Sequence, residues 1–162
     1  MYSKVLVPLD GSEVSERALA HAQSLADAFG ARVHLLQVIS VSHEYEAFRG
    51  GGNESPTAVE YSVDMARQLT ANRQTRAEAY LKATAARLEE NGTQVETSVL
   101  QGSILENITN FVAENGIDLI VMSTHGRGGL QRFFVGSVTD RVIRSSHVPV
   151  LAIPPEDEPS SG

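Results

Sequence analysis

The stretch Ser123–Ser137, STHGRGGLQRFFVGS, lies between an apolar run and the start of a helix. The run Leu119–Ser123 has the length and composition of a buried strand, and the segment SVTD at 137–140 has the form of a capping box that opens a helix. Four glycines in the stretch let its backbone bend sharply or approach a ligand closely. The stretch therefore predicts a strand, a basic loop and a helix start suited to a phosphate group.

The same alternation of strand and helix runs through the whole chain. Apolar runs of strand length predict strands at Lys4–Leu9, Arg32–Ile39, Leu119–Ser123 and Val148–Ile153, and the alternation of Gln94–Gln101 predicts a half-exposed strand. Three- and four-residue spacing of apolar positions, with cap residues at the ends, predicts helices at 12–30, about 58–90, 103–115 and 137–146. Residues 40–57 show no period and are predicted to form a long exposed loop.

Strands that alternate with helices predict an α/β fold of three layers, with an open parallel five-stranded sheet between helices. In such sheets ligands bind beyond the carboxyl ends of the strands, where the strand order reverses. With the Rossmann-like order 3-2-1-4-5, the loops Asp10–Ser12 and Ser123–Gly136 would face one site. A helix that starts at Ser137 would offer free N–H groups and its positive dipole end to an anion, and Arg127 could add a bidentate contact.

The residues alone leave two alternatives open at this site. Asp140 could cap the helix that follows the loop, and a helix capped by its own side chain needs no ligand. Asp10 could either accept a hydrogen bond from a ribose hydroxyl or simply form the turn before a helix. Spacing does not decide between these interpretations.

Charge divides the chain into two parts. The net charge of −7 argues against general binding of nucleic acids, which requires a basic face. Residues 119–155 nevertheless carry four arginines against one aspartate, a charge of +3 that leaves −10 for the rest. This positive island is either an anion site or a cluster of solvated arginines.

Several other classes of site are excluded or disfavoured. The chain has no cysteine, so disulfides, thiolate metal sites and cysteine nucleophiles are excluded, and its five histidines have no ligand spacing. It has no Walker A sequence and no Gly-x-Ser-x-Gly nucleophile motif. With neither a signal peptide nor an apolar run of membrane-spanning length, we expect a cytoplasmic domain at 1–154 and a disordered acidic tail at 155–162.

Taken together, four motifs resemble those of the universal stress protein family over residues 2–154. They are VPLDGS at 7–12, STHGRGGL at 123–130, VGSVTDRV at 135–142 and HVPVL at 147–151. The ATP-binding subclass of that family has the pattern Gly-x2-Gly-x9-Gly-[Ser/Thr]. Gly126, Gly136 and Ser137 match this pattern, and Ser123 stands in place of its first glycine.

The resemblance implies an adenine nucleotide hydrolase-like fold and a site for ATP. Pro8 and Asp10 would flank the adenosine, Val38 would meet the adenine, and Ser123 would lie near the ribose. The residues expected around the phosphates are Gly126, Arg127, Gly128, Gly129, Gly136, Ser137, Val138 and Thr139. A divalent ion, Mg²⁺, would be held mainly by the phosphates themselves rather than by protein ligands.

The resemblance also implies a homodimer or larger assembly that pairs through the edge strand Val148–Ile153. We expect ATP to act as a regulatory ligand that controls a stress response or a partner protein such as a transporter. The sequence offers no strong general base for a γ-phosphate, so any ATPase activity should be slow. The alternatives are a non-nucleotide-binding interaction or protective protein of the same family, and an enzyme that hydrolyses or transfers nucleotides.

Overall fold

The structure, a computed structural model, describes residues 1–40, 56–124 and 135–154. The strands are β1 Lys4–Leu9, β2 Arg32–Ile39, β3 Val95–Gln101, β4 Leu119–Ser123 and β5 Val150–Ile153. The helices are α1 Glu13–Phe29, α3 Pro56–Glu89, α4 Ile104–Asn115 and α5 Ser137–Ser145. All strand pairs are parallel, and the sheet order β3-β2-β1-β4-β5 confirms the predicted fold.

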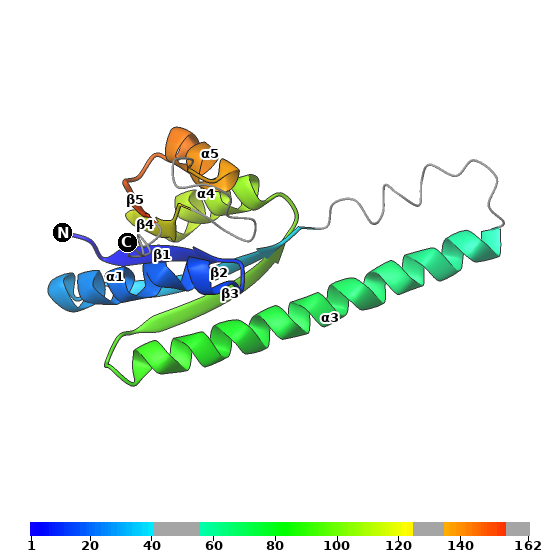
Figure 1. Cartoon of the computed structure of the whole chain (residues 1–162), viewed down its shortest axis with the longest axis horizontal. Coiled ribbons are helices and arrows are strands. Elements are labelled where there is room, and N and C mark those ends of the chain that lie inside the picture. Colours follow the sequence, from blue (N-terminus) through cyan, green and yellow to red (C-terminus); the bar gives the residue numbers. More distant parts are fainter. Residues whose placement is uncertain (41–55, 125–134, 155–162) are drawn as a thin grey trace, which may run out of the picture.

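Two layers of helices cover the sheet. Figure 1 shows α4 and α5 on one side of the sheet and α3 on the other. Side chains alternate along each strand, so Val5 and Val7 of β1 pack with α1 and α3, while Leu6 packs with α4 and α5. Each face therefore has its own apolar core, and β1 contributes to both.

The helix ends follow the predicted cap residues at most positions. Ser12 caps α1 by accepting a hydrogen bond from the Ser15 N–H, and Ser103 caps α4 by accepting one from the Glu106 N–H. Gly30 and Gly116 follow the two helices with φ of 66° and 63°, the left-handed conformation that glycine adopts most readily. These local signals were correctly interpreted from the sequence.

Two predicted boundaries were wrong. The last strand begins at Val150 instead of Val148, because the N–H and the carbonyl of Val148 both bind the Ser146 hydroxyl in a turn. The long helix begins at Pro56, so residues 56 and 57 are helical and not part of the loop. Residues 41–55 of the predicted loop and the predicted tail at 155–162 lie outside the described residues.

A polar contact joins α1 to α3. The Tyr80 hydroxyl donates to the Glu16 carboxylate at 3.0 Å, and Arg87 Nη2 donates to the other carboxylate oxygen at 2.9 Å. Burial, together with the neighbouring Glu16 carboxylate, raises the pKa of Tyr80 to about 12. Tyr80 therefore stays a hydrogen-bond donor at neutral pH.

Another polar cluster fastens the edge strand β3 to β2. The buried His34 ring lies 3.2 Å (Nδ1) from Glu96 Oε2 and 3.0 Å (Nε2) from Ser98 Oγ, and it packs on the Phe111 ring at a centroid distance of 4.6 Å. Burial lowers the pKa of His34 below its ordinary value, although Glu96 acts in the opposite direction. We assign the cluster to sheet structure.

None of the helices in the described part of the chain is both long enough and apolar enough to span a bilayer.

Candidate functional site

The point where the strand order reverses lies between β1 and β4. These strands are neighbours, with Val5 opposite Leu119 and Leu6 opposite Ile120. From β1 the chain continues to β2 on one side, and from β4 it continues to β5 on the other. The carboxyl ends of β1 and β4 therefore lie at the same edge of the sheet, on neighbouring strands, as predicted.

The loop after β4 is held at its base. The Gly136 N–H donates to the Thr124 carbonyl, and the Thr124 N–H donates to the Ile153 carbonyl at 2.8 Å. These bonds fix the start of α5 against the ends of β4 and β5. The predicted phosphate residues of the loop itself, Gly126, Arg127, Gly128 and Gly129, lie outside the described residues.

The N-terminus of α5 differs from the prediction. The N-cap residue is Gly136 instead of Ser137, and among the described residues no side chain makes a capping hydrogen bond there. Ser137 is exposed and already helical. Asp140 does not cap the helix either, because both of its carboxylate oxygens lie 3.0 Å from Arg144 Nε. The predicted capping box and the alternative of an Asp140 cap were therefore both wrong.

Thr139 anchors this helix end. Its hydroxyl is buried and donates to the Ser123 carbonyl at 2.9 Å. The bond joins the first turn of α5 to the last residue of β4, so the helix start has a fixed position at the edge of the sheet. The sequence placed Thr139 near phosphates and missed this anchor, because a threonine in a first turn gives no signal of its long-range partner.

Asp10 forms the turn between β1 and α1. Its Oδ1 accepts hydrogen bonds from the Ser12 N–H at 2.9 Å and from the Ser12 hydroxyl at 2.5 Å. The turn-forming alternative is therefore confirmed. Asp10 is half-buried at the end of β1, and a contact with ribose stays a prediction.

The three apolar residues of the predicted site, Pro8, Val38 and Val138, lie on the side of the sheet that α4 and α5 cover. Pro8 follows Leu6 by two residues and so faces the α4 and α5 side, where Val38 and Val138 also pack against the core at its margin. All three are half-buried. The fold thus brings the predicted adenosine residues Pro8 and Val38 to the face that carries α5, while their role stays a prediction.

The described site can bind an anion through its backbone. First-turn N–H groups and the helix dipole favour negative charge at an N-terminus that no side chain caps. Among the described residues no three His, Asp or Glu side chains gather where they could hold a metal ion.

Comparison with known proteins identifies the family. Residues 1–154 match the model of the universal stress protein family. The chain belongs to the universal stress protein family. Its relatives in Methanocaldococcus jannaschii include universal stress protein MJ0531, which is 35% identical over 94% of this chain and 82% of that protein. Universal stress protein MJ0577 of the same organism is 30% identical over 94% of this chain and 95% of its own length.

Solved structures have the same fold. The structure of MJ0577 matches with a TM-score of 0.74 at 30% identity and covers 98% of this chain and 99% of its own. A universal stress protein from Archaeoglobus fulgidus, solved in complex with dAMP, matches with a TM-score of 0.60 at 21% identity and covers 94% and 98%. The second likeness shows the shared fold alone.

Proposed function

We propose that this universal stress protein binds ATP at the edge of the sheet between β1 and β4. The phosphates would lie in front of the first turn of α5, and the adenosine would lie toward Pro8, Asp10 and Val38. The observation that supports this most is the start of α5 at Gly136, which lies beside the reversal in strand order and has no side-chain cap from any described residue.

The fixed first turn of α5 and the apolar side chains beside it favour a nucleotide as the ligand. Thr139 and the bond from Gly136 to Thr124 hold the first turn rigidly, so its N–H groups need little reorganisation to bind phosphate. Val38 and Val138 supply apolar surface on the same face. The structure from Archaeoglobus fulgidus was solved in complex with dAMP, so a protein of this fold can hold an adenine nucleotide.

The accompanying ion is proposed to be Mg²⁺, coordinated mainly by the phosphates. Mg²⁺ commonly retains waters and substrate oxygens in place of a complete set of protein ligands. Ser137 is exposed in the first turn of α5, so its hydroxyl would be available to the ion or to a phosphate oxygen. The proposal requires no metal site in the absence of nucleotide.

We further propose that ATP is a regulatory ligand in a cytoplasmic homodimer. The edge strand β5 pairs with β4 on one side, and among the described residues it has no strand on the other. Leu151 of β5 and Ile143 of α5 are exposed apolar side chains near this edge, and a second copy would bury them. Because α5 and β5 are consecutive, nucleotide at α5 could influence the dimer and a regulatory protein partner.

Mass spectrometry of small molecules released from the purified, denatured protein tests nucleotide binding. The proposal predicts adenine nucleotides in an amount comparable to the protein. If the protein is nucleotide-free, calorimetric titration with ATP and Mg²⁺ should give binding heat. Absence of both bound nucleotide and binding heat would overturn the proposal.

The alternative is a protein that uses the same loop for folding or dimer packing without nucleotide. It is favoured by Ser123, which replaces the first glycine of the ATP-binding pattern. Released AMP, ADP or ATP would exclude this alternative. An enzymatic function would be indicated by rapid phosphate release that is abolished in Gly136→Asp.

A further inference from the structure

The N-terminal part of α3 extends beyond the sheet. Figure 1 shows the helix continuing well past the edge of the sheet. Contact with the sheet is present at Gln74, whose side chain accepts a hydrogen bond from Gln101 at 3.2 Å, and Ala77 is the first buried residue of the helix that is described. Residues 57–73 therefore form roughly 25 Å of helix without a core contact among the described side chains.

Large apolar side chains follow this extension at four-residue intervals. Tyr61, Met65 and Leu69 are 70%, 46% and 42% exposed. We call these three residues the α3 stripe. Side chains four apart on a helix lie on one face, so the α3 stripe is continuous.

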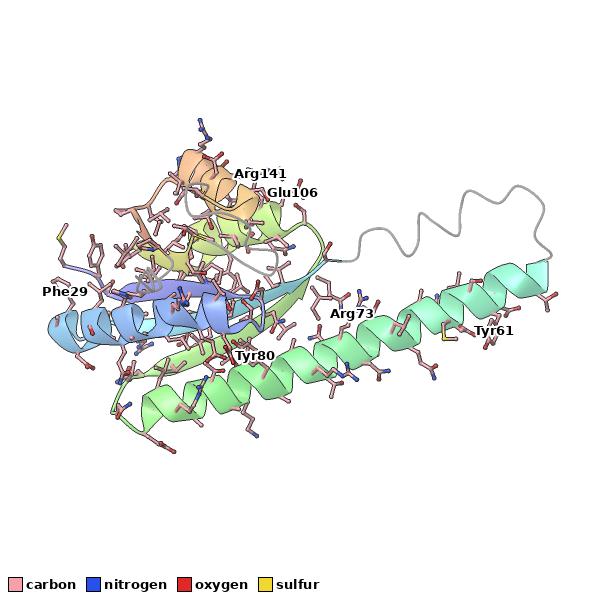
Figure 2. The ribbon with its side chains drawn as sticks, viewed as in Figure 1. Phe29, Tyr61, Arg73, Tyr80, Glu106 and Arg141 are labelled. Atoms are coloured by element: carbon pink, nitrogen blue, oxygen red, sulfur yellow. The ribbon has the colours of Figure 1, made fainter. Side chains whose placement is uncertain are left out.

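The α3 stripe faces away from the body of the protein. At about 100° per residue, Tyr61 and Met65 lie roughly 140–180° around the helix from the buried residues Leu81 and Leu88, and Leu69 lies about 100–120° from them. Figure 2 shows Tyr61 on the extension and Tyr80 on the side of α3 that faces the sheet. The stripe is therefore not an extension of the core face.

An isolated helical extension of this kind needs a partner. Most of the stability of helices in proteins comes from packing an apolar face against a neighbour. Within the described part of the chain, the exposed α3 stripe has no such packing. A second helix laid along the stripe would supply it.

The distribution of charge along the extension indicates that the partner helix is a second copy of α3. Residues 57–66 carry the acidic side chains Glu60 and Asp64, whereas residues 67–76 carry the basic side chains Arg67, Arg73 and Arg76. An antiparallel copy of the same helix would place each acidic half beside a basic half, and a parallel copy would place like charges together. Asp64 and Arg67 contact each other at 3.8 Å but remain 71% and 78% exposed, so their pairing is solvated.

We propose that the α3 stripe is an interface between two copies of this chain, in which the extensions of α3 pair antiparallel about a twofold axis near Met65. Tyr61 of each copy then packs toward Leu69 of the other, as a twofold interface requires. This contact is separate from the β5 edge proposed above. Use of both contacts would give an assembly larger than a dimer.

Cysteine cross-linking tests the contact directly, because the chain contains no cysteine. In the full-length protein, Met65→Cys should form disulfide-linked dimers on mild oxidation. The control is Ala71→Cys, an exposed position roughly 120° around the helix from the stripe, which should remain monomeric on denaturing gels. Equal linkage of both variants, or no linkage of Met65→Cys, would overturn the proposal.

A mixture of two variants tests the orientation. When Tyr61→Cys and Leu69→Cys chains of different tag mass are combined, antiparallel pairing predicts more mixed disulfide than either homodimer. A parallel pair would instead give mainly the two homodimers, and that result would contradict the proposal.

Sedimentation of the full chain carrying both Met65→Glu and Leu69→Glu supplies a readout without oxidation. The assembly should be reduced to half the wild-type mass, with helix content measured by circular dichroism to confirm folding. Unchanged mass with lower thermal stability would show that the stripe is covered within one chain. Unchanged mass and stability would show that no contact covers it; either result overturns the proposal.

Discussion

Helices α1 and α5 both begin where the strand order reverses, yet their N-termini are satisfied differently. The α1 start is closed by its own sequence, because Ser12 accepts from the Ser15 N–H at 3.1 Å and donates to Asp10. The α5 start has Gly136 at the same position and no side-chain cap. Among the described contacts, a side chain therefore takes one first-turn N–H of α1, that of Ser15, and none of α5.

A third helix provides a reference for this comparison. Helix α4 begins at the same edge of the sheet after β3, two strands away from the reversal, and Ser103 caps it. The difference therefore does not follow from the edge of the sheet as such. The difference follows from the residue that precedes each helix, which is a serine before α1 and α4 and a glycine before α5.

The largest effect is expected from Gly136→Asp. Its carboxylate would cap α5 and stand close to the proposed phosphates, and repulsion at about 6 Å costs on the order of 3 kcal/mol, roughly a hundredfold in affinity. Gly136→Asn caps a helix about as well without the charge and should lose much less. Calorimetric titration of both variants with ATP and Mg²⁺ measures the difference. Equal affinity in the two would mean that phosphate does not bind at this position.

A smaller loss is expected from Thr139→Val. The substitution keeps the side-chain shape but removes the hydrogen bond to the Ser123 carbonyl, which contributes about 1 kcal/mol to folding stability. Because this bond positions the first turn of α5, ATP affinity should also fall by a few-fold. Urea unfolding and calorimetry measure the two effects. A loss of stability with unchanged affinity would show that the anchor does not position the ligand site.

Ser123→Gly restores the first glycine of the family pattern and should tighten ATP binding by a few-fold. The backbone could then approach the ribose without a side chain in the way. A glycine within a strand should at the same time cost about 0.5–1 kcal/mol of folding stability. Competition binding with a fluorescent ATP analogue measures the affinity. Unchanged affinity would indicate that the serine does not obstruct the site.

Ser103→Ala should leave ATP affinity unchanged. It removes the cap of α4 and should lower folding stability by about 1 kcal/mol, as measured by urea unfolding. The site at α5 is two strands away and does not depend on this cap. A loss of affinity comparable to that of Thr139→Val would mean that helix capping acts through overall stability and not through the site.

Acidification should lower folding stability through His34 without altering the order of the ATP affinities of the variants above. Burial lowers the pKa of His34 from 6.5, so at this residue the folded chain binds fewer protons than the unfolded chain. Its contribution to stability should be complete above pH 6.5 and should decrease as the pH falls from 6.5 toward the folded-state pKa. Lys4 and Glu96 face the ring, and Arg32 contacts Glu96. Unfolding of His34→Gln should show a flatter dependence on pH; an unchanged slope would assign the dependence to other groups.

Most of the fold could be predicted from the sequence because its signals are local and repeated. Apolar runs indicated four strands and an alternating pattern indicated β3, while Ser12, Ser103 and Gly30 indicated helix ends by their own conformational preferences. The boundary at Val148 was wrong because the Ser146 hydroxyl forms hydrogen bonds with both the N–H and the carbonyl of Val148, so these groups do not join the sheet. Apolar composition carries no information about such a hydrogen bond.

The site was predictable in position but not in detail. Alternation of strands and helices placed the segments after β1 and β4 together, and the family motifs indicated which residues to expect there. The pattern Ser137 to Asp140 suggested a cap, yet Asp140 binds Arg144 one turn later in the helix. Thr139 and Ser123 meet across a loop whose length hides the contact from any local pattern.

The most direct test of the central claim is an NMR titration of the isotope-labelled protein with ATP and Mg²⁺. We predict large chemical-shift changes at the backbone amides of Ser137 and Val138 in the first turn of α5. The amides of Ile104 and Leu105, in the first turn of the capped helix α4, should remain unchanged. If saturating ATP leaves the α5 amides unmoved, or moves both helix starts equally, the assignment of the phosphate site to α5 is wrong.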